Sequence, residues 1–149
     1  MKPMYLMLCG FLLVAGAQAA DEPVAKPLVT THPVKVTRAQ AAGPIFQSPT
    51  AVKENGGDGP TTDVLMLRSK DGKLEAGLYD AGPSEQDIDS YPEDEFMFFL
   101  AGGVTLTSAD GKKLEARAGE GVAMPKGWKG HWSTTGYKKY YVTYNTAKK

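Results

Sequence analysis

One glutamate and one tyrosine are the side chains of this sequence best placed to do chemistry. Glu95 ends the acidic run 93–95 and follows Tyr91 by four positions. A carboxylate and a phenol can act as proton acceptor and donor when both lie inside a fold. An ionised carboxylate in an apolar interior is costly unless it is paired. We therefore expect a partner for Glu95, either Lys138, Lys139 or the Tyr91 hydroxyl; the alternative is a solvated acidic rim.

Metal ligands are scarce in this chain. It has two histidines, His32 and His131, and its only cysteine, Cys9, lies in an N-terminal apolar run. Tight transition-metal sites usually draw on three or four imidazole, thiolate or carboxylate ligands. We expect no cofactor; if a divalent transition metal is bound, the candidate ligands are Glu95, His131 and Asp89. His32, beside a proline, is expected to be an exposed loop residue.

The elements that must position these residues read as strands. From residue 63 onward, short alternating apolar and polar runs are broken by turn signals about every ten residues, a pattern typical of an all-β sandwich or barrel. Asp71-Gly72 and Asp110-Gly111 are hairpin signals. The run 140–144 is aromatic and β-branched, as a last strand would be. No segment shows a sustained helical period.

The first twenty residues have the order of a secretory signal peptide: a basic start, an apolar run of about a dozen residues, and the small-residue end Ala17-Gln18-Ala19. The run is shorter than the roughly 20 residues that span a bilayer. We expect export to a periplasm or to the exterior, with no membrane attachment after cleavage. Cys9 would be removed with this segment, leaving a mature chain without a thiol.

Residues 21–62 are predicted to be an N-terminal arm and loops, and residues 63–149 the barrel. Val34 and Val36 alternate with polar residues, which fits either a strand packed on the domain or on a partner subunit, or an extended tether. An arm paired across subunits would cover a sheet edge, so we expect a homodimer. Seventeen basic and seventeen acidic side chains balance, and no basic excess points to nucleic acid or an anionic membrane.

Two glycine-containing spacings resemble the cupin motifs. Glu95 is followed by six residues and Gly102; Gly119 is followed by five residues and then Pro125-Lys126-Gly127. The stretches 91–96, 125–130 and 138–142 further resemble the cupin subfamily named after ureidoglycine aminohydrolase. The resemblance implies a small cupin-type double-stranded β-helix, or jelly-roll, barrel that is commonly dimeric and holds its site in the barrel mouth. It does not transfer an activity, because fold alone never fixes function.

The cupin metal ligands are mostly missing at the matching positions. Glu95 falls at the carboxylate position, whereas the first-motif histidines fall at Asp89 and Tyr91, or at positions 88 and 90 with the longer spacing, and the second-motif histidine falls at Gly130. His131 lies one residue after the position of the second-motif histidine. Because side chains alternate across a strand, it should face outward unless a bulge intervenes. The resemblance therefore implies a metal-free barrel.

Alternation from Glu95 directs Met97 and Phe99 inward, where Tyr91, Trp132 and one parity of 140–144 should meet them. We predict a small-molecule ligand in the barrel mouth, bound by Glu95, Met97, Phe99, Trp132 and Tyr141. A solidly packed barrel is the structural alternative. The functional alternative is an enzyme of the lyase, isomerase or amidohydrolase class, with Glu95 and Tyr91 as catalytic acid and base or with the displaced metal site.

Overall fold

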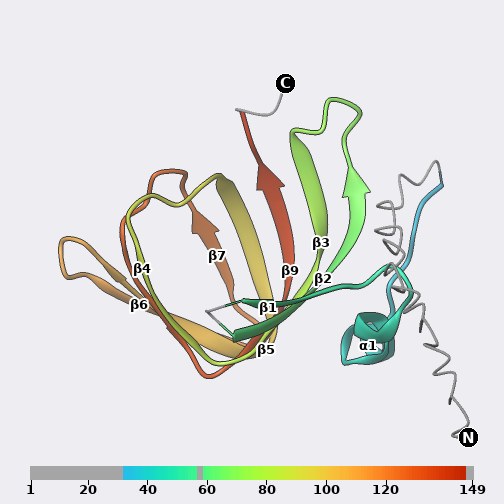
Figure 1. Ribbon diagram of the computed structural model, residues 1–149, viewed down its shortest axis with the longest axis horizontal. Coiled ribbons are helices and arrows are strands. Elements are labelled where there is room, and N and C mark those ends of the chain that lie inside the picture. Colours follow the sequence, from blue (N-terminus) through green and yellow to red (C-terminus); the bar gives the residue numbers. More distant parts are fainter. Residues whose placement is uncertain (1–31, 57–58, 147–149) are drawn as a thin grey trace, which may run out of the picture.

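The computed structural model describes residues 32–56 and 59–146, and these residues form one curled antiparallel sheet (Figure 1). The predicted signal peptide and residues 21–31 of the predicted arm lie outside the described residues. The described strands are β1 (Val52–Gly56), β2 (Gly59–Arg68), β3 (Leu74–Ala81), β4 (Ser84–Ile88), β5 (Asp94–Ser108), β6 (Lys113–Arg117), β7 (Gly121–Met124), β8 (Gly130–Thr134) and β9 (Tyr137–Tyr144). The predicted all-β barrel fold is confirmed.

The strand order is β1-β2-β3-β9-β5-β8-β4, and β6 and β7 also pair with β5. The 15-residue β5 joins the two halves of the curl. Its first half pairs with β9 and β7, and its second half pairs with β8 and β6. Its register against β9 shifts between Phe99 and Ala101, and this irregularity lies where β5 leaves one half for the other.

Gly102 makes that passage possible. Its φ of +65° is a left-handed conformation that favours glycine. A Cβ at this position would also lie 2.0 Å from the carbonyl oxygen of Gly136, in the turn between β8 and β9. Gly102, which ends the six-residue spacing after Glu95, is thus required to be glycine both by its backbone conformation and by the close approach of the Gly136 backbone.

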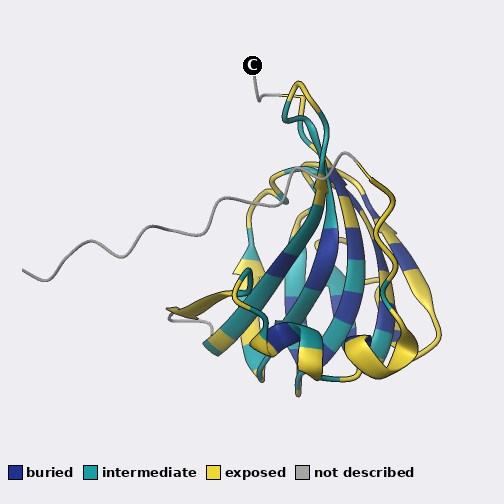
Figure 2. Cartoon of the chain, turned by 90° about the vertical axis from the view of Figure 1, so that its right-hand side faces the viewer, coloured by how far each residue is buried: buried dark blue, intermediate teal, exposed yellow. Residues whose placement is uncertain are grey.

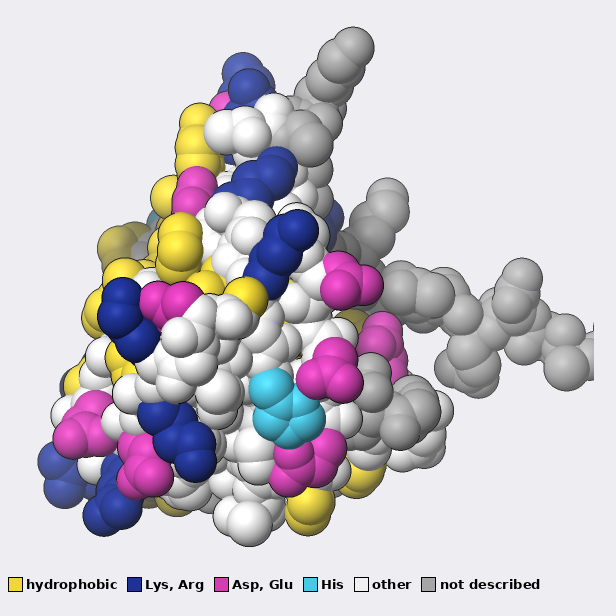
Figure 3. Space-filling model, turned by 90° about the vertical axis from the view of Figure 1, so that its left-hand side faces the viewer, with side chains coloured by type: hydrophobic (Ala, Val, Ile, Leu, Met, Phe, Trp, Pro, Cys, Tyr) yellow, Lys and Arg dark blue, Asp and Glu magenta, His cyan; other side chains and the backbone are white. Residues whose placement is uncertain are grey.

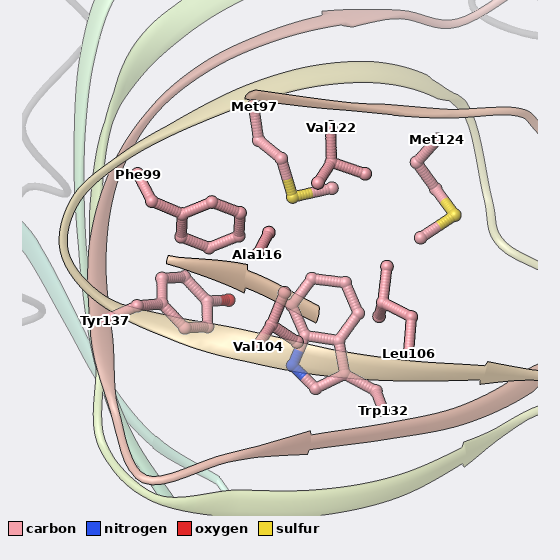
Figure 4. Packing of buried hydrophobic residues seen from close by; sticks show 9 residues of the cluster. All are labelled: Met97, Phe99, Val104, Leu106, Ala116, Val122, Met124, Trp132 and Tyr137. Atoms are coloured by element: carbon pink, nitrogen blue, oxygen red, sulfur yellow. The ribbon is translucent and has the colours of Figure 1, made fainter. Parts of the chain in front are cut away.

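Two hydrophobic layers, an inner and an outer one, pack against the two faces of the sheet. The inner layer fills the curl, where side chains from β5, β6, β7, β8 and β9 converge (Figure 4): Met97, Phe99, Val104, Leu106, Ala116, Val122, Met124, Trp132 and Tyr137. The outer layer lies on the opposite face of β2 and β3, under the N-terminal segment, and consists of Ala41, Phe46, Val64 and Leu78. Burial consequently alternates along the strands (Figure 2).

The N-terminal segment differs from the predicted arm and loops. Residues 33–37 form no strand, and Val36 packs against the outer layer of the same chain. Helix α1 (Arg38–Ala41) and the 3₁₀ helix η1 (Pro44–Gln47) follow. The four-residue α1 is too short to produce a helical period, although Thr37 and Gln40 form a capping box at its start.

Residues 52–62 are another difference, since they were expected to be loops. They form β1 and the start of β2, which pair with each other antiparallel from Val52↔Asp63 to Gly56↔Gly59. The turn-prone residues around 57–58 thus connect two strands of a hairpin. No described residues form a helix long and apolar enough to cross a membrane.

The glycine at position 102 gives the first prediction. Gly102→Ala should lower the free energy of unfolding by about 2–5 kcal/mol, from left-handed strain and from overpacking against the 136 carbonyl. Gly111→Ala is the control, because Gly111 has φ +84° but a Cβ added there would meet nothing within 4 Å; it should cost about 1–2 kcal/mol. Urea denaturation measures both, and equal losses would show that the close approach is unimportant.

Candidate functional site

A cavity of about 310 Å³ lies inside the curl, between the β2-β3-β9 wall and the β4-β8 wall. Aromatic, hydroxyl and carboxylate side chains line it, with one lysine among them. The lining residues are Thr61, Asp63, Glu75, Tyr79, Ala81, Ser84, Gln86, Ile88, Tyr91, Glu93, Glu95, Trp132, Tyr137, Lys139, Tyr141 and Thr143. A concave site with a few convergent polar groups among aromatic rings is the usual form of a small-ligand site.

A buried ion pair lies in this cavity. The Lys139 ammonium donates to Glu95 Oε1 at 2.6 Å, and both side chains are more than nine-tenths buried. The Tyr91 hydroxyl donates to the other carboxylate oxygen, Oε2. Both oxygens of Glu95 are therefore engaged, and of the proposed partners Lys139 and Tyr91 are found while Lys138 is not. The solvated-rim alternative is wrong for Glu95, although Asp94 beside it is exposed.

Strand register explains how the lysine reaches the glutamate. Lys139 lies opposite Phe99, whereas Glu95 lies opposite Thr143, so the two residues are separated along the strands. The side chain of Lys139 spans this offset by passing Met97, whose sulfur lies 3.9 Å from the ammonium nitrogen. The flexible four-carbon stem of a lysine suits such a reach.

Three aromatic rings surround the Lys139 ammonium. Its nitrogen lies 5.5 Å from the ring centroid of Tyr79, 5.6 Å from that of Tyr137 and 5.8 Å from that of Trp132. A cation within about 6 Å of an aromatic face is attracted by the ring quadrupole, most strongly when water is excluded. The rings therefore add to the stabilisation that the Glu95 carboxylate provides.

The phenols of the cavity are held in the protonated form. Burial, followed by the charge of Glu95 and the hydrogen bond to it, raises the pKa of Tyr91 well above its usual range. Burial likewise raises the pKa of Tyr137 and Tyr141. Asp63 accepts a hydrogen bond from the Tyr141 hydroxyl at 2.8 Å, yet burial raises the pKa of its carboxyl. At neutral pH these tyrosines do not act as bases, and the hydroxyl protons of Tyr91 and Tyr141 are already donated to Glu95 and Asp63.

The predicted site residues separate into two groups. Glu95, Tyr91, Trp132 and Tyr141 line the cavity. Met97 and Phe99 point inward as expected, but both are fully buried in the inner hydrophobic layer and do not line the cavity. Strand β7 contributes Val122 and Met124 to the same layer, and these two side chains fill the space around Met97 and Phe99.

Sequence reasoning missed the wall formed by β2 and β3. Asp63, Glu75 and Tyr79 face the cavity, while Leu78 between them packs in the outer layer. The alternation on β3 is visible in the sequence, but both faces of this strand are covered. Polarity alone therefore does not say which face is inside.

The alternative metal ligands are not brought together. His131 lies on the outer face, where its ring nitrogens contact Asp87 at 2.7 Å and Glu85 at 2.6 Å, and Asp89 is exposed. That face carries acidic and basic side chains side by side (Figure 3). The register of β8 against both neighbours is continuous, so no bulge turns His131 inward, and its predicted outward orientation is confirmed.

The other cupin ligand positions do not offer imidazole sites either. At Gly130 a Cβ would lie 2.2 Å from the Thr107 carbonyl oxygen and 2.6 Å from the Trp128 ring, so this position has no room for a side chain. Tyr91 fills a first-motif position with a hydroxyl that donates to Glu95. Among residues 32–56 and 59–146, no group of three or more histidine, cysteine, aspartate or glutamate side chains is arranged to hold a metal ion. The residues present do not fit the metal that the cupin motifs imply.

The curled sheet, its β5 crossing and its inward glutamate define a cupin-type domain. Residues 68–141 match the model of the EutQ-like cupin domain.

Solved structures share the fold. A putative ethanolamine utilization protein Q from Salmonella typhimurium LT2 is 18% identical over 65% of this chain and 95% of its own, with a TM-score of 0.50. The EutQ protein of Clostridium difficile is 22% identical over 76% and 82%, with a TM-score of 0.50. A protein of unknown function from Rhizobium leguminosarum bv. viciae 3841 is 24% identical over 76% and 98%, with a TM-score of 0.52. The search of curated proteins gave no significant match.

The outer-face histidine gives a pH prediction. Hydrogen bonds to Asp87 and then Glu85 raise the pKa of His131 above its ordinary value. A raised folded pKa means that these contacts stabilise the fold fully below about pH 6.5 and lose their contribution as pH rises through the folded pKa. An NMR titration should therefore show a His131 midpoint above about 6.5, and Asp87→Asn or Glu85→Gln should lower it. A midpoint at or below that value would contradict the contacts.

Proposed function

We propose that this protein is an exported, metal-independent cupin-domain protein that binds a small molecule in its barrel cavity. The observation that carries the proposal is the cavity of about 310 Å³, with Glu95, Lys139 and Tyr91 converging inside it. A barrel filled only for stability would have apolar side chains at these positions, because replacing a buried ion pair by apolar residues is often neutral or stabilising. Polar groups at the bottom of an open cavity are better explained by a ligand.

Export and location are proposed from residues 1–20 alone, whose order is that of a signal peptide. The protein would then act in a periplasm or outside the cell. The similar solved structures include two EutQ proteins, one of which is named a putative ethanolamine utilization protein. At their level of identity they support the fold and name no ligand for this chain. The finer resemblance to the ureidoglycine aminohydrolase subfamily likewise stays a prediction.

An enzyme is the second candidate function, and the Tyr91–Glu95 hydrogen bond favours it. In an enzymatic step Tyr91 would be the proton donor, and the substrate would have to replace Glu95 as the acceptor of its hydroxyl proton. Glu95, held by Lys139 on its other oxygen, would be the acceptor. Such a pair can serve a lyase, isomerase or amidohydrolase step without a metal. The variant with Glu95, His131 and Asp89 as metal ligands finds no support, because His131 lies on the outer face.

The proposal predicts that ligand binding depends on Glu95 and does not depend on His131. Ligands would first be found by screening a library of small polar and aromatic molecules against the purified mature chain by ligand-observed NMR. Glu95→Gln should then weaken binding of each cavity ligand at least about tenfold, because the carboxylate that holds the Lys139 ammonium and the Tyr91 hydroxyl in place is lost. His131→Ala, on the outer face, should leave binding unchanged. An inert Glu95→Gln with a disabled His131→Ala would contradict the assignment of the cavity.

We also propose a homodimer. Four apolar side chains are exposed in a row on the outer face of β5 and β9: Phe96, Phe98, Val142 and Tyr144. Phe96 pairs with Val142 across the two strands, and neither is among the residues that pack with the described part of the N-terminal segment. A second copy of the chain would remove this surface from water, which is the usual meaning of a contiguous exposed apolar patch.

Light scattering tests the dimer. The mature chain should be dimeric at tens of micromolar, and Phe96→Asp should shift it toward monomer. Leu114→Asp is the matched control, because Leu114 is similarly exposed but lies on β6, away from the row. A monomeric wild type, or equal effects of the two substitutions, would contradict a dimer through this face.

A further inference from the structure

Lys139 lies outside both cupin motif spacings, yet its charge lies at the motif glutamate. We propose that the Lys139 ammonium takes the place of the metal ion that the cupin motifs imply. The inference rests on the proposed metal-independent function and deepens it, since it says what balances the Glu95 charge and which contacts a ligand can make there. Three observations carry it.

The first observation is the saturation of Glu95. Its Oε1 accepts from the ammonium at 2.6 Å, and its Oε2 accepts from the Tyr91 hydroxyl. Tyr91 is itself at a position where the motif has an imidazole. The carboxylate thus has one full positive charge and one neutral donor beside it. This is the compensation that a buried carboxylate needs.

The second observation is the surrounding of the ammonium nitrogen. The rings of Tyr79, Tyr137 and Trp132 lie 5.5–5.8 Å from it, and the Met97 sulfur lies at 3.9 Å. Aromatic faces suit a monovalent ammonium, whereas a divalent transition metal requires ligand atoms with lone pairs. The nitrogen therefore lies in a cage built for an organic cation.

The third observation is the closure of the position of the second-motif histidine. Gly130 cannot accept a side chain, because the Thr107 carbonyl and the Trp128 ring occupy the space where one would begin. Trp128 is held there by a hydrogen bond from its indole nitrogen to the Ser108 hydroxyl at 3.0 Å. A metal at Glu95 would therefore lack this imidazole and would have to displace the ammonium or lie beside it.

An ammonium in place of a metal ion changes which contacts the cavity offers to a ligand. A metal ion offers exchangeable coordination positions, whereas an ammonium offers hydrogen bonds from N–H groups. The ligand atom that reaches the centre of the cavity would thus be a hydrogen-bond acceptor such as a carbonyl or hydroxyl oxygen. It would bind to N–H groups of Lys139 that Glu95 does not use, beside Tyr91, whose only hydroxyl proton is donated to Glu95.

A pair of adjacent lysines provides the stability test. Lys138 lies next to Lys139 on β9 but on the outer side, where it pairs with Asp80 at 3.0 Å and is partly exposed. Lys139→Met should lower the Tm by about 10 °C or more, because it leaves a buried carboxylate unpaired. Lys138→Met should lower it much less, as for a partly exposed pair. Adding Glu95→Gln to Lys139→Met should restore most of the loss.

Divalent ions provide the second arm. Mn²⁺ and Co²⁺ would be titrated into untagged wild type, Lys139→Gln and the double variant Glu95→Gln/Lys139→Gln, with binding followed by calorimetry and, for Mn²⁺, by electron paramagnetic resonance. Wild type should show no saturable site. Lys139→Gln should show measurable ion binding where wild type shows none, since the repelling charge is gone and Glu95 Oε1 is free. The gain should disappear in the double variant.

These results separate the inference from the proposed function. Equal Tm losses for the two lysine variants, or no gain of ion binding in Lys139→Gln, would overturn the role of Lys139 and leave ligand binding in the cavity intact. Stoichiometric metal in untagged wild type would overturn both the inference and the metal-independence. If Lys139→Met does not fold, the double variant with Glu95→Gln decides: a folded double variant supports the charge-balancing role, and an unfolded one contradicts it.

Discussion

The rest of the structure depends on a carboxylate and an ammonium buried together inside the curl. Either charge alone would be expensive in this interior, so Glu95 and Lys139 must be delivered to the same point. They come from different strands, and a slip of one residue between β5 and β9 would send one of them to the outer face. The register irregularity before Gly102 and the close approach of Gly136 are therefore constraints of the site as well as of the fold.

On strand β9, two neighbouring lysines point to opposite faces of the sheet, and each finds a carboxylate there. Lys138 points outward to Asp80 and lies over the ring of Phe46, which belongs to the outer layer. Lys139 points inward to Glu95 and lies among the rings of the cavity. Each lysine has a carboxylate and an aromatic face as partners, but on opposite sides of one sheet. The N-terminal segment thus contributes to the outer pair, since it supplies Phe46.

The local part of this architecture could be predicted from the sequence. Hairpin signals, alternation and the spacing from Glu95 to Gly102 predict the barrel, the inward glutamate and the outward His131. The choice between Lys138 and Lys139 could not be predicted, because it depends on the long-range register of β9. The wall with Asp63 and Tyr79 was missed because β3 pairs with the distant β9 and has both faces covered. Helix α1 is held by a capping box and by packing on the outer layer, and four residues are too few to show a period.

The identity of the central cation determines which chemistry the barrel supports. A metal held by imidazoles would polarise a ligand oxygen by direct coordination and could activate water. With Tyr91 and Gly130 at two of those positions, the cavity presents the N–H groups of Lys139 instead, while Tyr91 donates its proton to Glu95. Hydrogen bonds from the Lys139 ammonium are directional, and the surrounding rings hold the ammonium in place. Under the proposed function, the cavity would select ligands by the placement of acceptor atoms and by fit against aromatic faces.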